Sequence, residues 1–335
     1  MKRMIKLGLG SALILTAGVF ASDETTDDVV ATAGGVGDIG AFSGTNTPTA
    51  NEFTIKINRP MKVGQKMHVR GEGLQERTVT TVADGTSKNV EASSVSVSFD
   101  AEAHVLAVDP SGRPTRVSFD VTSCTMTTGE NPVEIAPAGS VITAVRKGVT
   151  TVFQVNGKPL GPEATAALDI VASLNVDGTF DDRVLGSEQP RGIGESWAMN
   201  VDEAVKVFQK NGSDGISKSD LFGLTTLVDM MEHRGQPCLV LHTQLSTENV
   251  IPGFDVPAGM SVKQANATAM FQGFFPIDET LPPLTDSMRL DMTAVLTGSG
   301  QGQPVELRIN GVRIVDLEQT PLPSSTASVT PSEME

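Results

Sequence analysis

A sequence frame that occurs twice decides the fold: Pro60-Met61-Lys62-Val63-Gly64-Gln65-Lys66-Met67 and, at an offset of 130 positions, Pro190-Arg191-Gly192-Ile193-Gly194-Glu195-Ser196-Trp197. Each copy reads proline, two variable residues, a β-branched residue, glycine, two polar residues and a large apolar residue. A second frame recurs further on, because Val105–Val117 matches Val228–Val240 at an offset of 123. Matches in the same order at nearly equal offsets are typical of duplicated structural units.

The second frame has the pattern of a β-hairpin. A short apolar strand ends at an acid, Asp109 or Glu232, and Gly112-Arg113-Pro114 or Gly235-Gln236-Pro237 leads into the next strand. We expect each glycine to supply a positive φ and each proline to begin the return strand, where a missing N–H donor does little harm. The match also predicts a strand over Thr225–Glu232, which local propensity leaves ambiguous.

Between the ends of the chain the dominant pattern is alternation of apolar and polar residues. This pattern predicts sheets with one buried face and one wet face. It occurs in Thr54–Asn58, Val95–Phe99, Arg116–Val121, Arg289–Met292, Val305–Ile309 and Arg313–Leu317. Short connections predict antiparallel pairing, and Asn156-Gly157 and Asn310-Gly311 indicate tight hairpins.

Helical spacing is rarer. Pro162–Leu174 begins with residues suited to a first turn and carries an apolar stripe, so we expect a helix that lies across the concave apolar face of the sheet. Asp202–Gln209 is a second candidate that could equally be a strand. The predicted fold class is mainly β (α+β): two repeated halves of curved antiparallel sheet, half-barrel-like, with one or two covering helices. The halves either pack together or join in one curved sheet.

The N-terminus predicts export. Lys2, Arg3 and Lys6 precede a short apolar run, and Ala21 ends it with the small residues of a cleavage site. We expect residues 1–21 to be a signal peptide cleaved after about Ala21, which places the protein in the periplasm or outside the cell. The expected divisions that follow are a disordered linker at 22–52, a first β repeat at 53–183, a second at 184–319 and a disordered tail at 320–335.

The charge restricts the class of partner. The formal net charge is −15, and removal of three cationic residues with the signal peptide makes it −18. Such a chain repels phosphate backbones and anionic membrane surfaces, so nucleic acid is not expected as a partner. The sequence after residue 21 contains no stretch long and apolar enough to span a membrane. It does not identify a protein partner.

The sequence predicts no catalytic, metal-binding or cofactor-binding residue, and therefore no enzyme. The four histidines are not spaced as metal ligands. Gly194–Ala198 faintly resembles a nucleophile elbow, but it lacks a strand before it and a helix after it. Lys210–Gly215 resembles a calcium loop, but Lys210 would stand at the first ligand position.

Two kinds of residue leave alternatives open. Cys124 and Cys238 both lie in strand-like runs, and they are either a disulfide, which export permits, or two buried free thiols. The only tryptophan and a group of methionines in the second half either fill an ordinary core or line an adaptable apolar pocket. The candidate lining residues are Trp197, Met199, Met230, Met270 and Met292.

The Pro190–Trp197 segment, together with the hairpin over Thr225–Leu245, resembles a group of secreted bacterial proteins that repeat a Pro-x-x-Val/Ile-Gly-x-x-Trp entry. More loosely, the pattern is similar to the curved-sheet periplasmic lipoprotein carriers LolA and LolB. The resemblance extends over roughly Phe53–Gln319 and rests on these short motifs. It implies the architecture and an exported location, and it brings no catalytic residue.

Two functional hypotheses follow. The first is a non-enzymatic exported protein that binds a lipid or another apolar small molecule in a cup between curved sheets. This hypothesis predicts a continuous apolar cavity lined by Met, Leu and Phe from both halves. The second is a structural or protein-interaction protein of the cell envelope with a filled core and no ligand pocket.

Overall fold

The computed structural model describes residues 52–323 except 84–85, 149, 175–181, 211–215, 250–255, 257–258 and 301–302. The predicted signal peptide and both predicted tails lie almost wholly outside the described residues. The described elements, in chain order, are β1 Phe53–Ile55, β2 Lys66–Ala83, β3 Thr86–Val108, β4 Pro114–Thr127, β5 Pro132–Glu134, β6 Val141–Lys147, β7 Thr150–Val155, β8 Lys158–Pro159, α1 Pro162–Val171, β9 Ser187–Arg191, β10 Ser196–Ala198, α2 Val201–Lys210, the 3₁₀ turn η1 Lys218–Asp220, β11 Leu221–His233, β12 Gln236–Glu248, β13 Met260–Pro276, β14 Thr285–Gly300 and β15 Gln303–Pro321.

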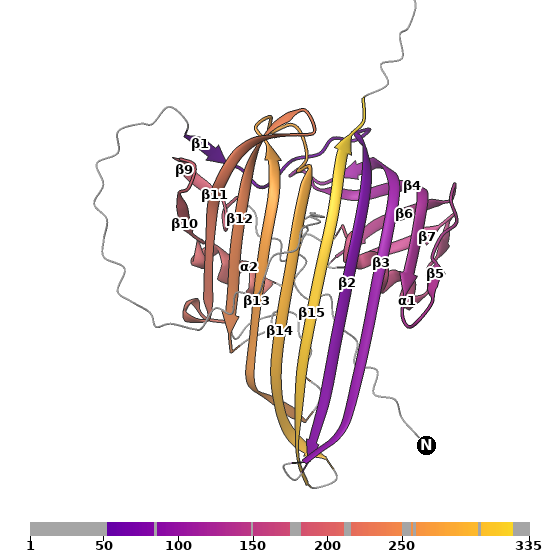
Figure 1. The fold of residues 1–335 in the computed structure, drawn as a ribbon, viewed down its shortest axis with the longest axis vertical. Helices are drawn as coiled ribbons and strands as arrows, with labels where there is room; N and C mark the ends of the chain where they lie inside the picture. The colour runs from indigo at the N-terminus through magenta and orange to yellow at the C-terminus, as the bar shows by residue number, and fades with distance from the viewer. Residues whose placement is uncertain are drawn as a thin grey trace, which may run out of the picture.

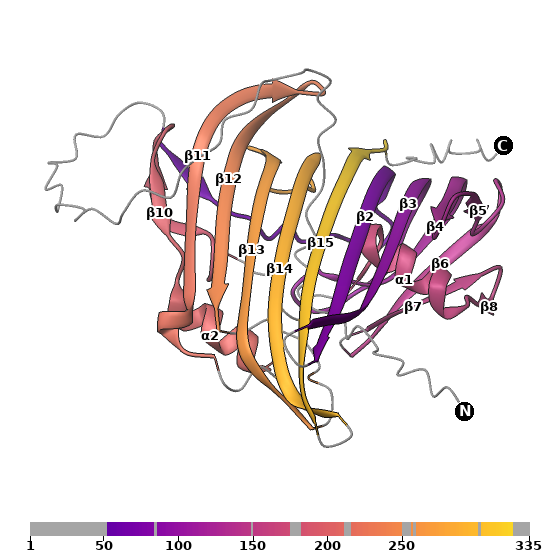
Figure 2. The same ribbon diagram turned by 60° about the horizontal axis from the view of Figure 1, so that its bottom comes forward.

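One antiparallel sheet of 13 strands dominates the molecule (Figures 1 and 2). Its order is β10-β11-β12-β13-β14-β15-β2-β3-β4-β6-β7-β8, with β5 beside β4, and its two edges do not meet. β1 and β9 form a separate two-stranded sheet. The predicted mainly β class, with antiparallel sheet and one or two helices, is therefore confirmed; the described residues contain two α-helices.

The sheet joins the beginning of the described chain to its end. β15 pairs antiparallel with β2 over a register that runs from Val305↔Ala83 to Pro321↔Met67. In Figure 1 the yellow β15 and the indigo β2 lie side by side in the middle of the sheet. Of the two arrangements that the sequence leaves open, the structure has the continuous sheet.

The two copies of the proline–glycine frame adopt the same backbone turn. Gly64 and Gly194 have φ values of +88° and +86°. Gly64 donates its N–H to the carbonyl of Val105 at 2.9 Å, and Gly194 donates to the carbonyl of Leu227 at 2.7 Å. In the structure the counterpart of Val105 is therefore Leu227, whereas the sequence match pairs Val105 with Val228. The shift by one position arises because β11 has a bulge after Leu227.

The predicted hairpin turns are confirmed at three places and wrong at one. Gly112 and Gly235 have φ values of +79° and +75°, and Asn156-Gly157 turns β7 into β8 with positive φ at both residues. Asn310-Gly311, however, lies inside β15, with no break in pairing to β14 or β2. A Cβ on Gly311 would lie 3.1 Å from the Cε of Met292, so glycine here makes room for a neighbouring side chain.

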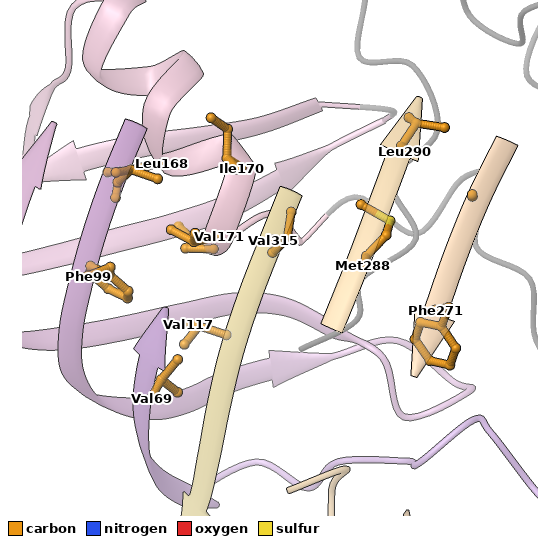
Figure 3. Packing of buried hydrophobic residues seen from close by; sticks show 14 of the residues in the cluster. Val69, Phe99, Val117, Leu168, Ile170, Val171, Phe271, Met288, Leu290 and Val315 are labelled. Carbon is orange, nitrogen blue, oxygen red and sulfur yellow. The ribbon is translucent and has the colours of Figure 1, made fainter. Parts of the chain in front are cut away.

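Both helices cover the same face of the sheet, which we call the helix-covered face. Helix α1 confirms the helix predicted over Pro162–Leu174, and α2 shows that Asp202–Gln209 is helical. α1 packs closely on β2 because glycines there leave space, and a Cβ on Gly71 would lie 3.2 Å from Val171. Figure 3 shows Ile170 and Val171 of α1 close to Val315 of β15. The main core lies between this face, the two helices and β1.

The register distributes side chains to the two faces. On the helix-covered face the paired, buried residues include Leu227, Leu241, Phe271, Met288, Val315, Phe99 and Val117. The opposite face carries mostly polar and charged side chains, such as Arg289, Asp291, Arg308, Glu306, Arg70 and Glu72. This division is the predicted alternation of buried and wet faces.

Both cysteines are buried free thiols. Cys124 lies in β4 and Cys238 in β12, and β13, β14, β15, β2 and β3 separate these strands in the sheet. The disulfide alternative is therefore not formed in this fold. Burial raises the pKa of the Cys124 thiol to about 12, with the charge of Glu134 acting in the same direction. Burial also raises the pKa of Cys238.

Candidate ligand site

An apolar hollow lies between α2 and strands β11–β14 on the helix-covered face. Its empty volume is about 280 Å³, which includes space open to solvent. Its lining residues are Met199, Phe208, Leu221, Phe222, Leu245, Ser246, Thr247, Ala267, Ala269 and Leu290. These residues all come from the second half of the chain. The predicted cavity draws its lining from both halves, whereas this hollow is lined by the second half alone.

The floor of the hollow follows from the strand register. Ala269 lies between Leu245 of β12 and Leu290 of β14, and Ala267 lies next to it on the same face, opposite Thr247. Small alanine side chains flanked by leucines leave a depression in the sheet surface. The alternation of small residues along β13 therefore produces the hollow.

Helix α2 and the segment before it form the other wall. Phe208 of α2 is 2 % exposed and lines the hollow, and Met199 lies just before the helix. Met199 donates its backbone N–H to the carbonyl of Gly223 at 2.9 Å. A Cβ on Gly223 would come within 2.7 Å of both Met199 and Leu245, so only glycine permits this close approach.

The lining is almost free of polar groups. Ser246 and Thr247 are its only hydroxyl residues, and it contains no charged side chain. A site of this composition gains free energy by removing apolar surface from water, at about 25 cal/mol per Å². It suits a hydrocarbon ligand better than a sugar or a peptide backbone, whose polar groups would lose hydrogen bonds to water.

One charged side chain stands beside the hollow. Arg313 of β15 is the cross-strand partner of Leu290, and both lie on the helix-covered face. Arg313 Nη2 donates to the carbonyls of Asp169 at 3.0 Å and Ile170 at 3.2 Å, at the end of α1. Burial lowers the pKa of Arg313, and Asp169 acts in the opposite direction.

The structure distributes the five predicted lining residues over three environments. Met199 lines the hollow. Trp197 is a core residue that is 6 % exposed, and its Nε1–H donates to the carbonyl of Leu185 at 2.8 Å. Met292 is partly buried against the main core, opposite Ala267 in the register. Met230 and Met270 are 38 % and 44 % exposed and do not line the hollow.

The sequence analysis did not select the residues that shape the site. Ala267, Ala269 and Leu290 form the floor, and Phe208 forms part of the wall. The run Ala265-Asn266-Ala267-Thr268-Ala269 places small residues at every second position of a strand, which is the one signal in the sequence for a depression in the sheet.

The described residues contain no group of three or more His, Cys, Asp or Glu side chains placed to hold a metal ion. Within the same residues, no helix combines the length and the apolar character needed to cross a membrane. Asp286 is 4 % exposed and its Oδ1 has no hydrogen-bond partner among the described residues; burial raises the pKa of its carboxyl well above the ordinary value.

Comparisons with known proteins give distant structural likenesses. No protein-family model and no curated protein matches the sequence. Lipovitellin, in a structure titled for its lipid–protein interactions, aligns with a TM-score of 0.32 at 10 % identity and covers 81 % of this chain. This chain spans 27 % of that lipovitellin chain.

Two further structures are weaker likenesses. A mutant porin of Rh. blastica aligns at 10 % identity with a TM-score of 0.18, covering 74 % of this chain and 99 % of its own. A LolA superfamily protein from Nitrosomonas europaea aligns at 11 % identity with a TM-score of 0.11, covering 75 % and 87 %. All of these TM-scores are below 0.5, so the likenesses to lipovitellin, the porin and the LolA superfamily protein are distant and assign this chain to no family.

Proposed function

We propose that this protein binds a lipid or another apolar small molecule in the hollow between α2 and strands β11–β14, without catalysing a reaction. The observation that carries the proposal is a solvent-accessible hollow whose lining contains no charged residue and on whose face, among the lining residues, Thr247 places the hydroxyl. The hollow is small, because its empty volume of about 280 Å³ includes space open to solvent. One acyl chain is therefore a better fit than a whole multi-chain lipid.

The N-terminal pattern supports an exported location for this activity. The basic, apolar and small-residue regions before Ala21 have the order of a signal peptide. We expect the mature protein to begin near Ser22 and to meet its ligand in the periplasm or outside the cell. N-terminal sequencing of the protein recovered from those fractions tests the location, and a full-length cytoplasmic product would contradict it.

The direct test of binding is extraction of the purified native protein followed by mass spectrometry for lipid, together with titration of a fluorescent fatty-acid analogue. Ala269→Phe places a ring in the hollow and should abolish binding of the analogue. Thr268→Phe is the matched control, because Thr268 is the next residue in β13, with its side chain on the opposite face. Met199→Ala enlarges the hollow and should keep binding.

The proposal fails if the wild-type protein yields no lipid and does not bind the analogue at any concentration below aggregation. It also fails if Ala269→Phe and Thr268→Phe bind as well as the wild type. Circular dichroism of each variant separates loss of the site from loss of the fold.

A structural or protein-interaction role is the second candidate, and a specific surface favours it. Strand β11 exposes Phe222 by 56 %, Val228 by 45 % and Met231 by 46 %. Contiguous exposed apolar patches mark interaction sites, and Val228 and Met231 lie three residues apart in this strand. Light scattering over a concentration series would show self-association through this strand, and Val228→Ser, which leaves the hollow unchanged, should then reduce it.

A further inference from the structure

Two arginines interrupt the apolar helix-covered face. Gly311 and Arg313 lie two positions apart in β15, so they share the helix-covered face. Arg77 of β2 is the cross-strand partner of Gly311, so the side chains of Arg313 and Arg77 both lie on this face. Arg313 is thus diagonal to Arg77 across the β15–β2 pair, an arrangement that brings long side chains within reach of each other. Arg313 is 8 % exposed, which is rare for an arginine.

The hydrogen-bonding capacity of both guanidinium groups is incompletely used within the described chain. The Nε of Arg313 and the Nε of Arg77 are buried and have no hydrogen-bond partner. Arg313 bonds to backbone carbonyls rather than to a carboxylate. Burial is the main cause that lowers the pKa of each, opposed by Asp169 at Arg313 and by Glu91 at Arg77.

A buried cation with open donor positions is costly to the folded state unless an anion completes it. Guanidinium groups are the protein groups best suited to carboxylate and phosphate, because they present several N–H donors in a planar fork. The two arginines therefore have the chemistry of a receptor for an acidic head group.

This pair adjoins the hollow through the strand register. Arg313 is directly opposite Leu290, a residue of the hollow's lining. A second row of cross-strand neighbours lies beside this one on the same face. In it, Met292 of β14 pairs with Ala267 of the lining on one side and with Gly311 of β15 on the other. Gly311 pairs in turn with Arg77 of β2. The Met292 side chain occupies the space above Gly311, and a methionine can rearrange its rotamer at little cost.

We propose that the ligand of the hollow is an anionic amphiphile whose carboxylate or phosphate group binds Arg313 and Arg77 while its hydrocarbon chain lies against Ala267, Ala269 and Leu290. This inference rests on the proposed function and specifies its ligand. The acidic group of the ligand supplies the acceptor oxygens that the two Nε atoms lack, and the hydrocarbon chain of the ligand contacts the uncharged lining.

The experiment compares three ligands with one hydrocarbon chain and different head groups: oleic acid, oleyl phosphate and oleyl alcohol. Displacement of a bound fluorescent fatty-acid analogue gives their affinities. We expect the wild-type protein to bind at least one acid about tenfold or more tightly than the alcohol, as charged hydrogen bonds in a buried site allow. The better of the two acids identifies the head group.

Three variants assign the preference to residues. Arg313→Met and Arg77→Met should bring the acid and the alcohol to within about twofold of each other, with little change in affinity for the alcohol. Arg308→Met is the matched control from the same strand, because Arg308 lies on the opposite face, where it donates to Glu306 at 2.8 Å. It should keep the preference of the wild type.

The outcomes separate the two proposals. Equal affinity of the wild type for acid and alcohol overturns the anionic ligand and leaves the apolar site intact. No binding of any of the three ligands overturns the apolar site itself. If Arg313→Met does not fold, Arg77→Met decides, because Arg77 is only partly buried and its variant should fold. An unchanged preference in Arg77→Met would then overturn the inference.

Discussion

Gly64 and Gly194 hold the same left-handed backbone conformation, φ +88° and +86°, at the entrance to β2 and β10. Each donates its N–H across to a residue of the neighbouring strand, and each is followed by a polar residue whose side chain accepts from the backbone three positions earlier: Gln65 from Lys62 and Glu195 from Gly192. The same frame of residues therefore builds the same turn in both halves of the sheet.

Replacing either of these glycines by alanine should destabilise the protein. An L-residue at this φ costs about 1–2 kcal/mol, although a Cβ at Gly64 or Gly194 would meet nothing within 4 Å. Urea unfolding followed by the fluorescence of Trp197 would give the loss in the free energy of unfolding. Gly129→Ala is the control, because Gly129 is equally open and does not have a positive φ. Equal stability of all three variants would contradict the strain argument.

The packing of α1 on β2 predicts a coupled pair of substitutions. A Cβ on Gly73 would overlap the Cγ2 of Ile170 and come within 3.0 Å of Val171. Gly73→Ala should therefore cost about 1–3 kcal/mol, as overpacking does. In the Ile170→Ala background, which removes the overlapping methyl group, the same change should cost clearly less. Strictly additive free energies in the double-mutant cycle would show that the helix does not rest on this glycine.

The hairpin that joins β3 to β4 should make stability depend on pH. Asp109 accepts bonds from Arg146 at 2.7 Å, from the Ser111 hydroxyl at 2.6 Å and from the Arg113 N–H at 3.1 Å. Burial raises the pKa of the Asp109 carboxyl, but these bonds outweigh burial and hold the pKa well below its usual range.

Because the pKa of Asp109 is lower in the folded state, its contribution to stability is present above the ordinary pKa of about 4 and is lost as pH falls below it. Asp109→Asn should cost about 2 kcal/mol at pH 7, and the difference from wild type should shrink towards pH 2–3. Urea unfolding at several pH values measures this. Glu232→Gln, at the exposed matching position of the second hairpin, should change stability by less than about 0.5 kcal/mol. A constant difference for Asp109→Asn across the pH range would exclude the carboxylate as its cause.

The cysteines should be unreactive in the native protein. Both thiols are buried, and burial raises the pKa of each, to about 12 for Cys124, so the reactive thiolate is scarce at neutral pH. A thiol reagent should label neither cysteine of the folded protein and both after unfolding without reductant. If neither Cys124 nor Cys238 were labelled after unfolding, both thiols would be oxidised, which would contradict this prediction.

Local patterns in the sequence predict the turns and faces because those depend on neighbouring residues. The alternation over Val95–Phe99 places Val97 and Phe99 on the helix-covered face, and Gly112 turns its hairpin with positive φ, as expected. Asn310-Gly311 has the same local signal as Asn156-Gly157, yet it lies within a strand. What differs is Met292, a side chain from β14, and no local pattern contains it.

The candidate site depends almost entirely on such neighbours. Ala267 and Ala269 read as ordinary half-buried strand residues, and they form a hollow only because Leu245 and Leu290 flank them and Phe208 stands over them. Met230 and Met270 are of a residue type that suits an apolar pocket, but their side chains are exposed. Sequence composition placed the candidate lining residues in the second half but predicted a cavity shared by both halves, whereas the residues that form the hollow follow from strand register.

The pairing of β15 with β2 has a consequence for how the chain reaches this structure. Among the described strands of the sheet, β15 is synthesised after all the others. Until it pairs, β2 and β14 each keep a row of unpaired backbone donors and acceptors. Contacts between segments so distant in sequence form slowly. Without β15 the described sheet is two incomplete half-sheets with exposed edges that favour aggregation, and it becomes one cooperative unit only when the 19 residues of β15 close the gap.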